Sequence, residues 1–121
     1  MKNLTTFCKD FELTAAIKTK LEEKLSSLNK YLNEDESSVT FNARLGKTSN
    51  SHNNGKIYYV EVSIHTPHKN YGARIEAEEI YSAIDLIRDE LAHNINHHRE
   101  KVRDQSRREE LKFKQEVRSV E

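Results

Sequence analysis

Apolar residues recur along the chain at two different periods, and the change of period divides it into helices and strands. Between residues 14 and 32 the apolar residues lie three or four apart, which predicts an amphipathic helix that begins after Thr14. The apolar stripe of this helix consists of Ile17, Leu21, Leu25, Leu28 and Leu32. A second helix is predicted over residues 78–101, with a stripe made of Ile80, Ile84, Ile87, Leu91 and Ile95.

Four segments instead alternate apolar and polar residues, which predicts strands with one buried face. The expected strands cover residues 3–8, 38–45, 56–66 and 70–77. Pro67 ends the third strand because proline cannot continue a hydrogen-bonded ladder. Residues 46–56 are polar and turn-forming, with Asn54-Gly55 as the strongest reversal signal, and they predict a long, mobile hairpin connection.

The expected order of elements is therefore β-α-β-β-β-α, which is an α+β fold. Two helices that each carry one apolar stripe need a shared apolar surface, and a sheet with one buried face supplies it. We predict a two-layer sandwich in which a four-stranded sheet carries both helices on one face, after a right-handed crossover from the first strand to the second. A chain of 121 residues has room for one such domain.

The second predicted helix changes character along its length. Residues 78–101 would extend about 36 Å as a helix, whereas strands of about eight residues reach only about 26 Å, so its last turns must overhang the sheet. One Arg stands against five carboxylates between Glu78 and His97, a net charge of −4. Eight Lys or Arg stand against six acids between His98 and Glu121, a net charge of +2. The basic character therefore begins where the packing signal stops.

Composition narrows the function. The chain has 20 Lys and Arg against 20 Asp and Glu, so recognition of nucleic acid would depend on local clusters of charge rather than on net charge. The single Cys8 is expected as a small buried residue of the first strand, and the absence of a second cysteine is typical of a reducing compartment. No apolar run approaches about 18 residues and charges interrupt the N-terminal segment, so we expect a soluble, cytoplasmic protein.

Two stretches of the chain resemble one known family. "EEIYSAIDLIRDEL", residues 78–91, resembles the signature Asp-Met-Tyr-x-Ala-Ile-Asp of the ribosome hibernation promoting factor and protein Y family, also called the ribosome-associated inhibitor or sigma-54 modulation family. "FELTAAIKTKLEEKLSSLNKYL", residues 11–32, is similar to the first helix of that family. The resemblance covers residues 1–103 and implies a hibernation factor-like domain there. Residues 104–121 are then a charged C-terminal tail, either an extension of the helix or disordered, as expected of a short form that lacks the C-terminal dimerisation domain of long members.

The resemblance implies a function as well as a fold. Family members are laid out like double-stranded RNA-binding domains and bind the small ribosomal subunit through 16S rRNA. They occupy the channel for mRNA and tRNA and silence idle ribosomes in stationary phase or stress. Such occlusion requires no catalysis, cofactor, membrane or small-molecule substrate, and the chain is expected to be monomeric off the ribosome.

The resemblance also implies which side chains meet rRNA phosphates. The basic positions that match those of the family are Lys24, Lys30, Arg99, Lys101 and Arg103. Each of them is also compatible with ordinary solvated surface. Tyr81 and Asp85 match signature residues, which we interpret as structural: an aromatic ring that packs at the helix start and a carboxylate that holds the local geometry.

The chain departs from the family on the exposed side of the second helix. Where members usually have Lys and Arg, it has Glu90, His93, Asn96 and His97. A carboxylate opposes phosphate, and a histidine with an ordinary pKa is mostly neutral at pH 7. We retain His93 and His97 as candidates for rRNA binding and hypothesise that protonation of these two and of His98 tightens binding between about pH 7.5 and 6.

Other functions find less support in the sequence. His93 and His97 are four apart on a helix, as two metal ligands would be, but no Cys, Asp or Glu at helical spacing obviously completes a site, and we predict no metal. The sequence lacks a phosphate-binding glycine loop, a nucleophile elbow and a zinc signature, so we predict no enzymatic activity. The alternative is a divergent family domain that acts as a protein-interaction module without strong ribosome binding.

Overall fold

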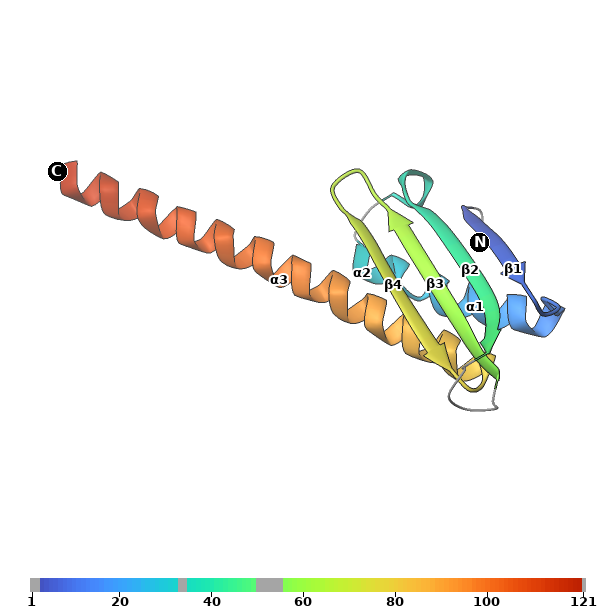
Figure 1. Cartoon of the computed structure of the whole chain (residues 1–121). Coiled ribbons are helices and arrows are strands. Elements are labelled where there is room, and N and C mark those ends of the chain that lie inside the picture. Colours follow the sequence, from blue (N-terminus) through green and yellow to red (C-terminus); the bar gives the residue numbers. More distant parts are fainter. Residues whose placement is uncertain (1–2, 33–34, 50–55, 121) are drawn as a thin grey trace.

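The sheet holds four strands in the order β1-β2-β3-β4 in a computed structural model that describes residues 3–32, 35–49 and 56–120 (Figure 1). The strands are β1 (Leu4–Lys9), β2 (Thr40–Ser49), β3 (Lys56–His65) and β4 (Asn70–Ala77). β1 runs parallel to β2, and the other two pairs are antiparallel. A parallel pair needs a crossover, which the first helical segment supplies. The α+β architecture predicted from the change of period is confirmed.

The first predicted helix is divided into two. α1 (Ala15–Ser26) begins as expected, because Thr14 Oγ1 accepts a hydrogen bond of 3.2 Å from the Ile17 N–H. The hydroxyl of Ser27 then donates to the Lys24 carbonyl at 2.6 Å, which competes with the backbone for this acceptor, and α2 (Asn29–Leu32) follows after a short break. The prediction of one continuous helix over residues 14–32 was therefore wrong, although its apolar stripe stays buried across the break.

The connection between β2 and β3 also differs from the prediction. The sequence predicted a loop over residues 46–56, but β2 and β3 are paired through the whole of both strands. Lys47 lies opposite Tyr58 with its Nζ 5.3 Å from the ring centroid, so a cation-π contact supports the ladder in this polar sequence. The Asn54-Gly55 reversal lies outside the described residues. A short 3-10 helix, η1 (Glu36–Ser38), precedes β2.

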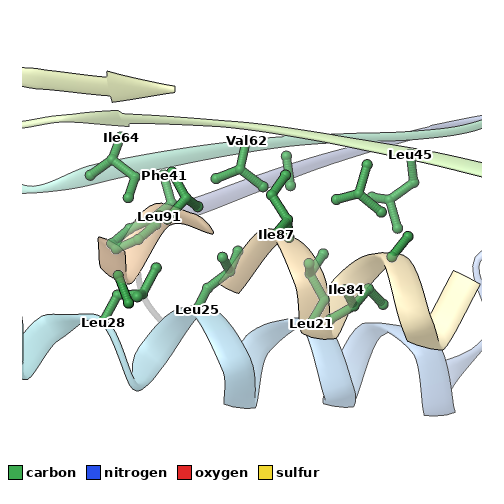
Figure 2. Close-up of a cluster of buried hydrophobic side chains, with 14 of the residues drawn as sticks. Leu21, Leu25, Leu28, Phe41, Leu45, Val62, Ile64, Ile84, Ile87 and Leu91 are labelled. Atoms are coloured by element: carbon green, nitrogen blue, oxygen red, sulfur yellow. The ribbon is translucent and has the colours of Figure 1, made fainter. Parts of the chain in front are cut away.

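The core lies between the sheet and the helices, which cover the same face of the sheet (Figure 2). Side chains of α1, of the sheet and of the last helix interdigitate in one cluster. Its largest fully buried members include Leu21, Leu25, Phe41, Ile64, Ile84 and Leu91. The two-layer arrangement expected from the apolar stripes is therefore present.

The last helix, α3 (Ile80–Val120), has 41 residues and is the longest element (Figure 1). It begins two residues later than predicted and continues past residue 101 to Val120, so the charged tail extends the helix, which is one of the two alternatives that the sequence left open for it. Burial stops at Ile95, and every side chain from 99 to 109 is exposed. Residues 96–120 contain neither Gly nor Pro and alternate charges of both signs, so the helix needs no core to continue.

Candidate nucleic-acid interface

A concave surface forms where α3 passes the turn between β3 and β4. Its larger part, named here the larger cleft, has a volume of about 520 Å³. Its apolar lining comes from α2, β4 and α3, and its polar lining comes from the turn and from α3. The larger cleft is lined by Leu32, Thr66, His68, Lys69, Tyr71, His98, Arg99, Val102 and Arg103. Three elements that are distant in sequence therefore build one site.

A second hollow, named here the smaller cleft, adjoins the first and has a volume of about 270 Å³. It lies between the start of β4 and the side of α3 that faces it. The smaller cleft is lined by Lys69, Asn70, Tyr71, Gly72, Asn94, His97, His98 and Lys101. Lys69, Tyr71 and His98 line both clefts, so they form the ridge that separates them.

Local contacts fix the geometry of this ridge. Thr66 Oγ1 accepts a hydrogen bond of 2.9 Å from the Lys69 N–H, which shapes the tight turn that brings Lys69 towards α3. The Lys69 ammonium lies 3.3 Å from Nδ1 of His98 and 5.9 Å from the ring centroid of Tyr71. The rings of Tyr71 and His98 meet edge to face with centroids 6.1 Å apart. A cation and two aromatic rings therefore stand together between the clefts.

The surroundings of His98 favour its neutral form. Partial burial lowers the pKa of His98 below its usual value, and the positive charges of Lys69 and Lys101 lower it further. Neutral His98 can accept a hydrogen bond from Lys69 at Nδ1. His98 in the free protein is therefore protonated at lower pH than the hypothesis of tighter binding between about pH 7.5 and 6 assumed.

The charge around the two clefts has one sign. Among the described residues that line them, none is Asp or Glu. The lining includes four permanent cations, and they are Lys69, Arg99, Lys101 and Arg103. Three histidines accompany them, and they are His68, His97 and His98. In a chain whose formal net charge is zero, the lining of the clefts gathers positive charge, and the nearest carboxylates in sequence, Glu100 and Asp104, stand outside that lining.

The structure brings together part of the predicted rRNA-binding set. Arg99 and Arg103 line the larger cleft, and His97 and Lys101 line the smaller one. The remaining candidates, Lys24, Lys30 and His93, line neither cleft. The Lys30 ammonium lies 5.0 Å from the ring centroid of Tyr31, and the ring of His93 stacks on that of His97 at 6.2 Å.

Lys24 belongs to a different cluster, in which charges of both signs are paired. The ammonium groups of Lys20 and Lys24 each lie 3.3 Å from a carboxylate oxygen of Asp85. Desolvation raises the pKa of Asp85, but hydrogen bonds and charge from Lys24 and Lys20 together outweigh it, so that pKa lies below its usual value. Tyr81, which was expected to pack at the helix start, lies outside the core with 41% of its surface exposed and the Lys20 ammonium 5.5 Å from its ring centroid.

Two arginines of α3 hold the α1–α2 break against the helix, a role that the sequence analysis missed. Arg88 donates from Nε to Ser27 Oγ at 3.0 Å and from Nη2 to the Tyr31 hydroxyl at 3.3 Å. Arg99 donates from Nη1 to the Tyr31 carbonyl at 3.0 Å. Hydrogen bonds from Arg88 and Lys30 lower the pKa of Tyr31 below its usual value. Arg99 therefore both satisfies a carbonyl of α2 and carries charge into the larger cleft.

Other site chemistries find little support among the described residues. In that part of the chain, no group of three or more His, Cys, Asp or Glu is placed to hold a metal ion. Cys8 is half-buried, donates to the Phe11 carbonyl at 3.3 Å, and has its pKa raised by burial, which favours the thiol over the reactive thiolate. None of the described helices is both long and apolar enough to cross a membrane.

The family model and the solved structures that match this chain agree with one another. The family model described as Sigma 54 modulation protein / S30EA ribosomal protein matches residues 4–103. The fold is similar to the N-terminal domain of Protein Y from Thermus thermophilus, with a TM-score of 0.60 and 22% identity over 79% of this chain and 98% of that one. It is also similar to a ribosomal subunit interface protein from Coxiella burnetii, with a TM-score of 0.59 and 14% identity over 79% and 96% of the two chains. Comparison with curated proteins gave no match.

Proposed function

Because the chain belongs to the Sigma 54 modulation protein / S30EA ribosomal protein family, whose match covers residues 4–103, we propose that it is a hibernation factor that binds 16S rRNA in the small ribosomal subunit. It occupies the channel for mRNA and tRNA and thereby silences idle ribosomes in stationary phase or stress. It acts in the cytoplasm and is monomeric off the ribosome. Inhibition by occupancy needs no catalytic group and no cofactor.

The observation that carries this proposal is the separation of charge on the surface. Lys and Arg balance Asp and Glu over the whole chain, but the two clefts present four cations and no carboxylate. Phosphate groups that enter the clefts meet a lining that contains cations and no carboxylate. On the outer face of the sheet, by contrast, Arg74 has carboxylate partners, Glu61 at 3.5 Å and Glu76 at 3.2 Å.

The experiment that tests this proposal is sedimentation of the purified chain with vacant small subunits over a series of salt concentrations. Co-migration that weakens steadily as salt rises is the expected result, because binding to phosphates releases counterions. The Lys101→Ala/Arg103→Ala variant should bind at least about tenfold more weakly. Its plot of log affinity against log salt should also be shallower by about 1.4 to 1.8, the loss expected for two phosphate contacts.

A matched control removes the same number of charges from cations that have carboxylate partners and are not candidates for rRNA binding. In Lys20→Ala/Arg74→Ala the deleted side chains are partners of Asp85 and of Glu61 and Glu76, so subunit affinity should change by less than about twofold. Equal loss of affinity in the two double variants would contradict the assignment of binding to the clefts. Absence of co-migration even at low salt would contradict rRNA docking altogether and favour the protein-interaction module.

A further inference from the structure

The concave shape of the interface distinguishes between two forms of RNA. An A-form duplex presents its phosphates as ridges and is read by protein groups that reach across its wide minor groove. Unpaired nucleotides can instead turn their bases into hollows and stack them on aromatic side chains. The interface offers two hollows, the larger and smaller clefts, of about 520 and 270 Å³.

The lining of the larger cleft has the chemistry of a nucleotide site. Leu32, Tyr71 and Val102 supply apolar and aromatic surface, while Arg99 and Arg103 supply charge. Val102 is the only apolar residue between positions 99 and 109, and 48% of its surface is exposed. An apolar side chain beside two cations suits a ligand that combines a flat ring with a phosphate.

The ridge between the clefts places a cation where a linking phosphate would lie. Lys69 and His98 approach each other to 3.3 Å, and both residues face both clefts. Two bases on either side of the ridge would be joined by one phosphodiester above it. The edge-to-face contact between Tyr71 and His98 holds the two rings in a fixed relation, which lowers the cost of ordering them upon binding.

We propose that the two clefts bind two consecutive unpaired nucleotides of RNA, with one base in each cleft and the intervening phosphate on the Lys69–His98 ridge. This inference rests on the proposed function, because it names the form of RNA that the rRNA-binding surface recognises. The layout of the domain resembles proteins that bind duplex RNA, yet the site selects single strands. The preference follows from the hollows and from the apolar side chain that stands in one of them.

The test measures fluorescence anisotropy of a labelled single-stranded RNA hexamer of mixed sequence and of a 16-base-pair RNA duplex, with the full chain at one fixed low salt concentration. The hexamer should bind the more tightly of the two. Val102→Glu places a carboxylate in the larger cleft and should weaken hexamer binding by about tenfold or more, a change within the range for loss of one stacked base.

Leu86→Glu is the matched control, because Leu86 lies on the same helix with 50% of its surface exposed, adds the same charge, and lines neither cleft. It should weaken hexamer binding by less than about twofold. Tyr71→Leu, which keeps apolar bulk but removes the ring, should also weaken the hexamer, whereas Tyr71→Phe should not. Tighter binding of the duplex, or equal effects of Val102→Glu and Leu86→Glu, would overturn the inference.

Sedimentation with small subunits separates this inference from the proposed function. If Val102→Glu co-migrates as the unaltered chain does and the hexamer does not bind, the cleft assignment fails while ribosome binding stands. If the hexamer binds with the expected sensitivity to Val102→Glu but the unaltered chain does not co-migrate, the clefts are upheld and rRNA docking fails.

Discussion

The two halves of α3 share one hydrogen-bonded backbone but meet different requirements. From Ile80 to Ile95 the helix buries a side chain at every third or fourth position against the sheet and α1. From Arg99 to Glu109 all side chains are exposed, and the helix continues through local propensity and charged residues of both signs rather than through a core. The buried half therefore fixes how the whole helix is rotated about its axis. Because the backbone is continuous, this rotation also sets the direction in which each side chain of the exposed half points.

The fixed rotation of the helix explains how an exposed segment can carry a defined site. Arg99 is one turn beyond Ile95, so it lies above the same face that packs on the core. That position brings its guanidinium to the Tyr31 carbonyl and to the larger cleft. Packing in the first half thus determines which side chains of the second half meet the β3–β4 turn.

The largest effect is expected from damage to the buried half. Leu91 is fully buried, and Leu91→Ala should lower the free energy of unfolding by about 2–5 kcal/mol, as measured by urea denaturation. Affinity for single-stranded RNA, measured at a temperature where the variant stays folded, should change by less than about twofold. Loss of RNA affinity in a folded variant would show that packing of the buried half affects the clefts beyond setting the rotation of the helix.

Arg99 has two roles, because it bonds the Tyr31 carbonyl and also carries charge into the larger cleft. Arg99→Ala removes the hydrogen bond to the Tyr31 carbonyl and should lower the free energy of unfolding by about 0.5–1 kcal/mol, while RNA affinity falls several-fold. Arg99→Lys keeps the charge and should retain most of the affinity, although its melting temperature should fall with that of Arg99→Ala. The two roles would not be separable if Arg99→Lys lost affinity as fully as Arg99→Ala does.

The smallest effect is expected in the pH dependence of stability that His98 of the ridge contributes. Because the pKa of His98 is lower in the folded chain than in the unfolded one, its contribution to stability is complete above about pH 6.5 and is lost as pH falls through the folded pKa. The melting temperature of the unaltered chain should therefore fall relative to that of His98→Gln between about pH 7 and 5. In Lys69→Gln the decline should be shallower, since one of the charges that oppose protonation is gone.

A difference between the unaltered chain and His98→Gln that is independent of pH would contradict this assignment. The separate hypothesis that protonation of His93, His97 and His98 tightens RNA binding remains a prediction. For His98 the expected tightening begins at lower pH, unless bound phosphate stabilises the imidazolium.

Those parts of the fold that follow from the spacing of apolar residues could be predicted from the sequence. Alternation and three-or-four spacing gave the element order, the single sheet and the core stripe. The break at Ser27 could not be predicted, because the hydroxyl that donates to the Lys24 carbonyl there also accepts a hydrogen bond from Arg88, which lies on another helix. The full length of the β2–β3 ladder was missed because cross-strand contacts, such as that of Lys47 with Tyr58, stabilise polar sequence that reads as a loop.

The candidate site could be predicted only along one helix. Arg99, Lys101 and Arg103 follow one another on α3, so matching positions of the family were enough to indicate them. Lys69 and Tyr71 were missed because their proximity to His98 exists only after the β3–β4 turn has packed beside α3. Lys24 stays a prediction, and its pairing with Asp85 could not be foreseen because that carboxylate lies on another helix.

Because α3 is long, a small rotation of the domain moves the far end of this helix by a large distance. From Ile95, the last buried position, the helix continues 25 residues to Val120, which corresponds to about 37 Å. A rotation of the domain by about 10° would move the far end by about 6 Å, given that rise per residue. A probe attached there would amplify differences in docking orientation that are too small to resolve at the clefts themselves.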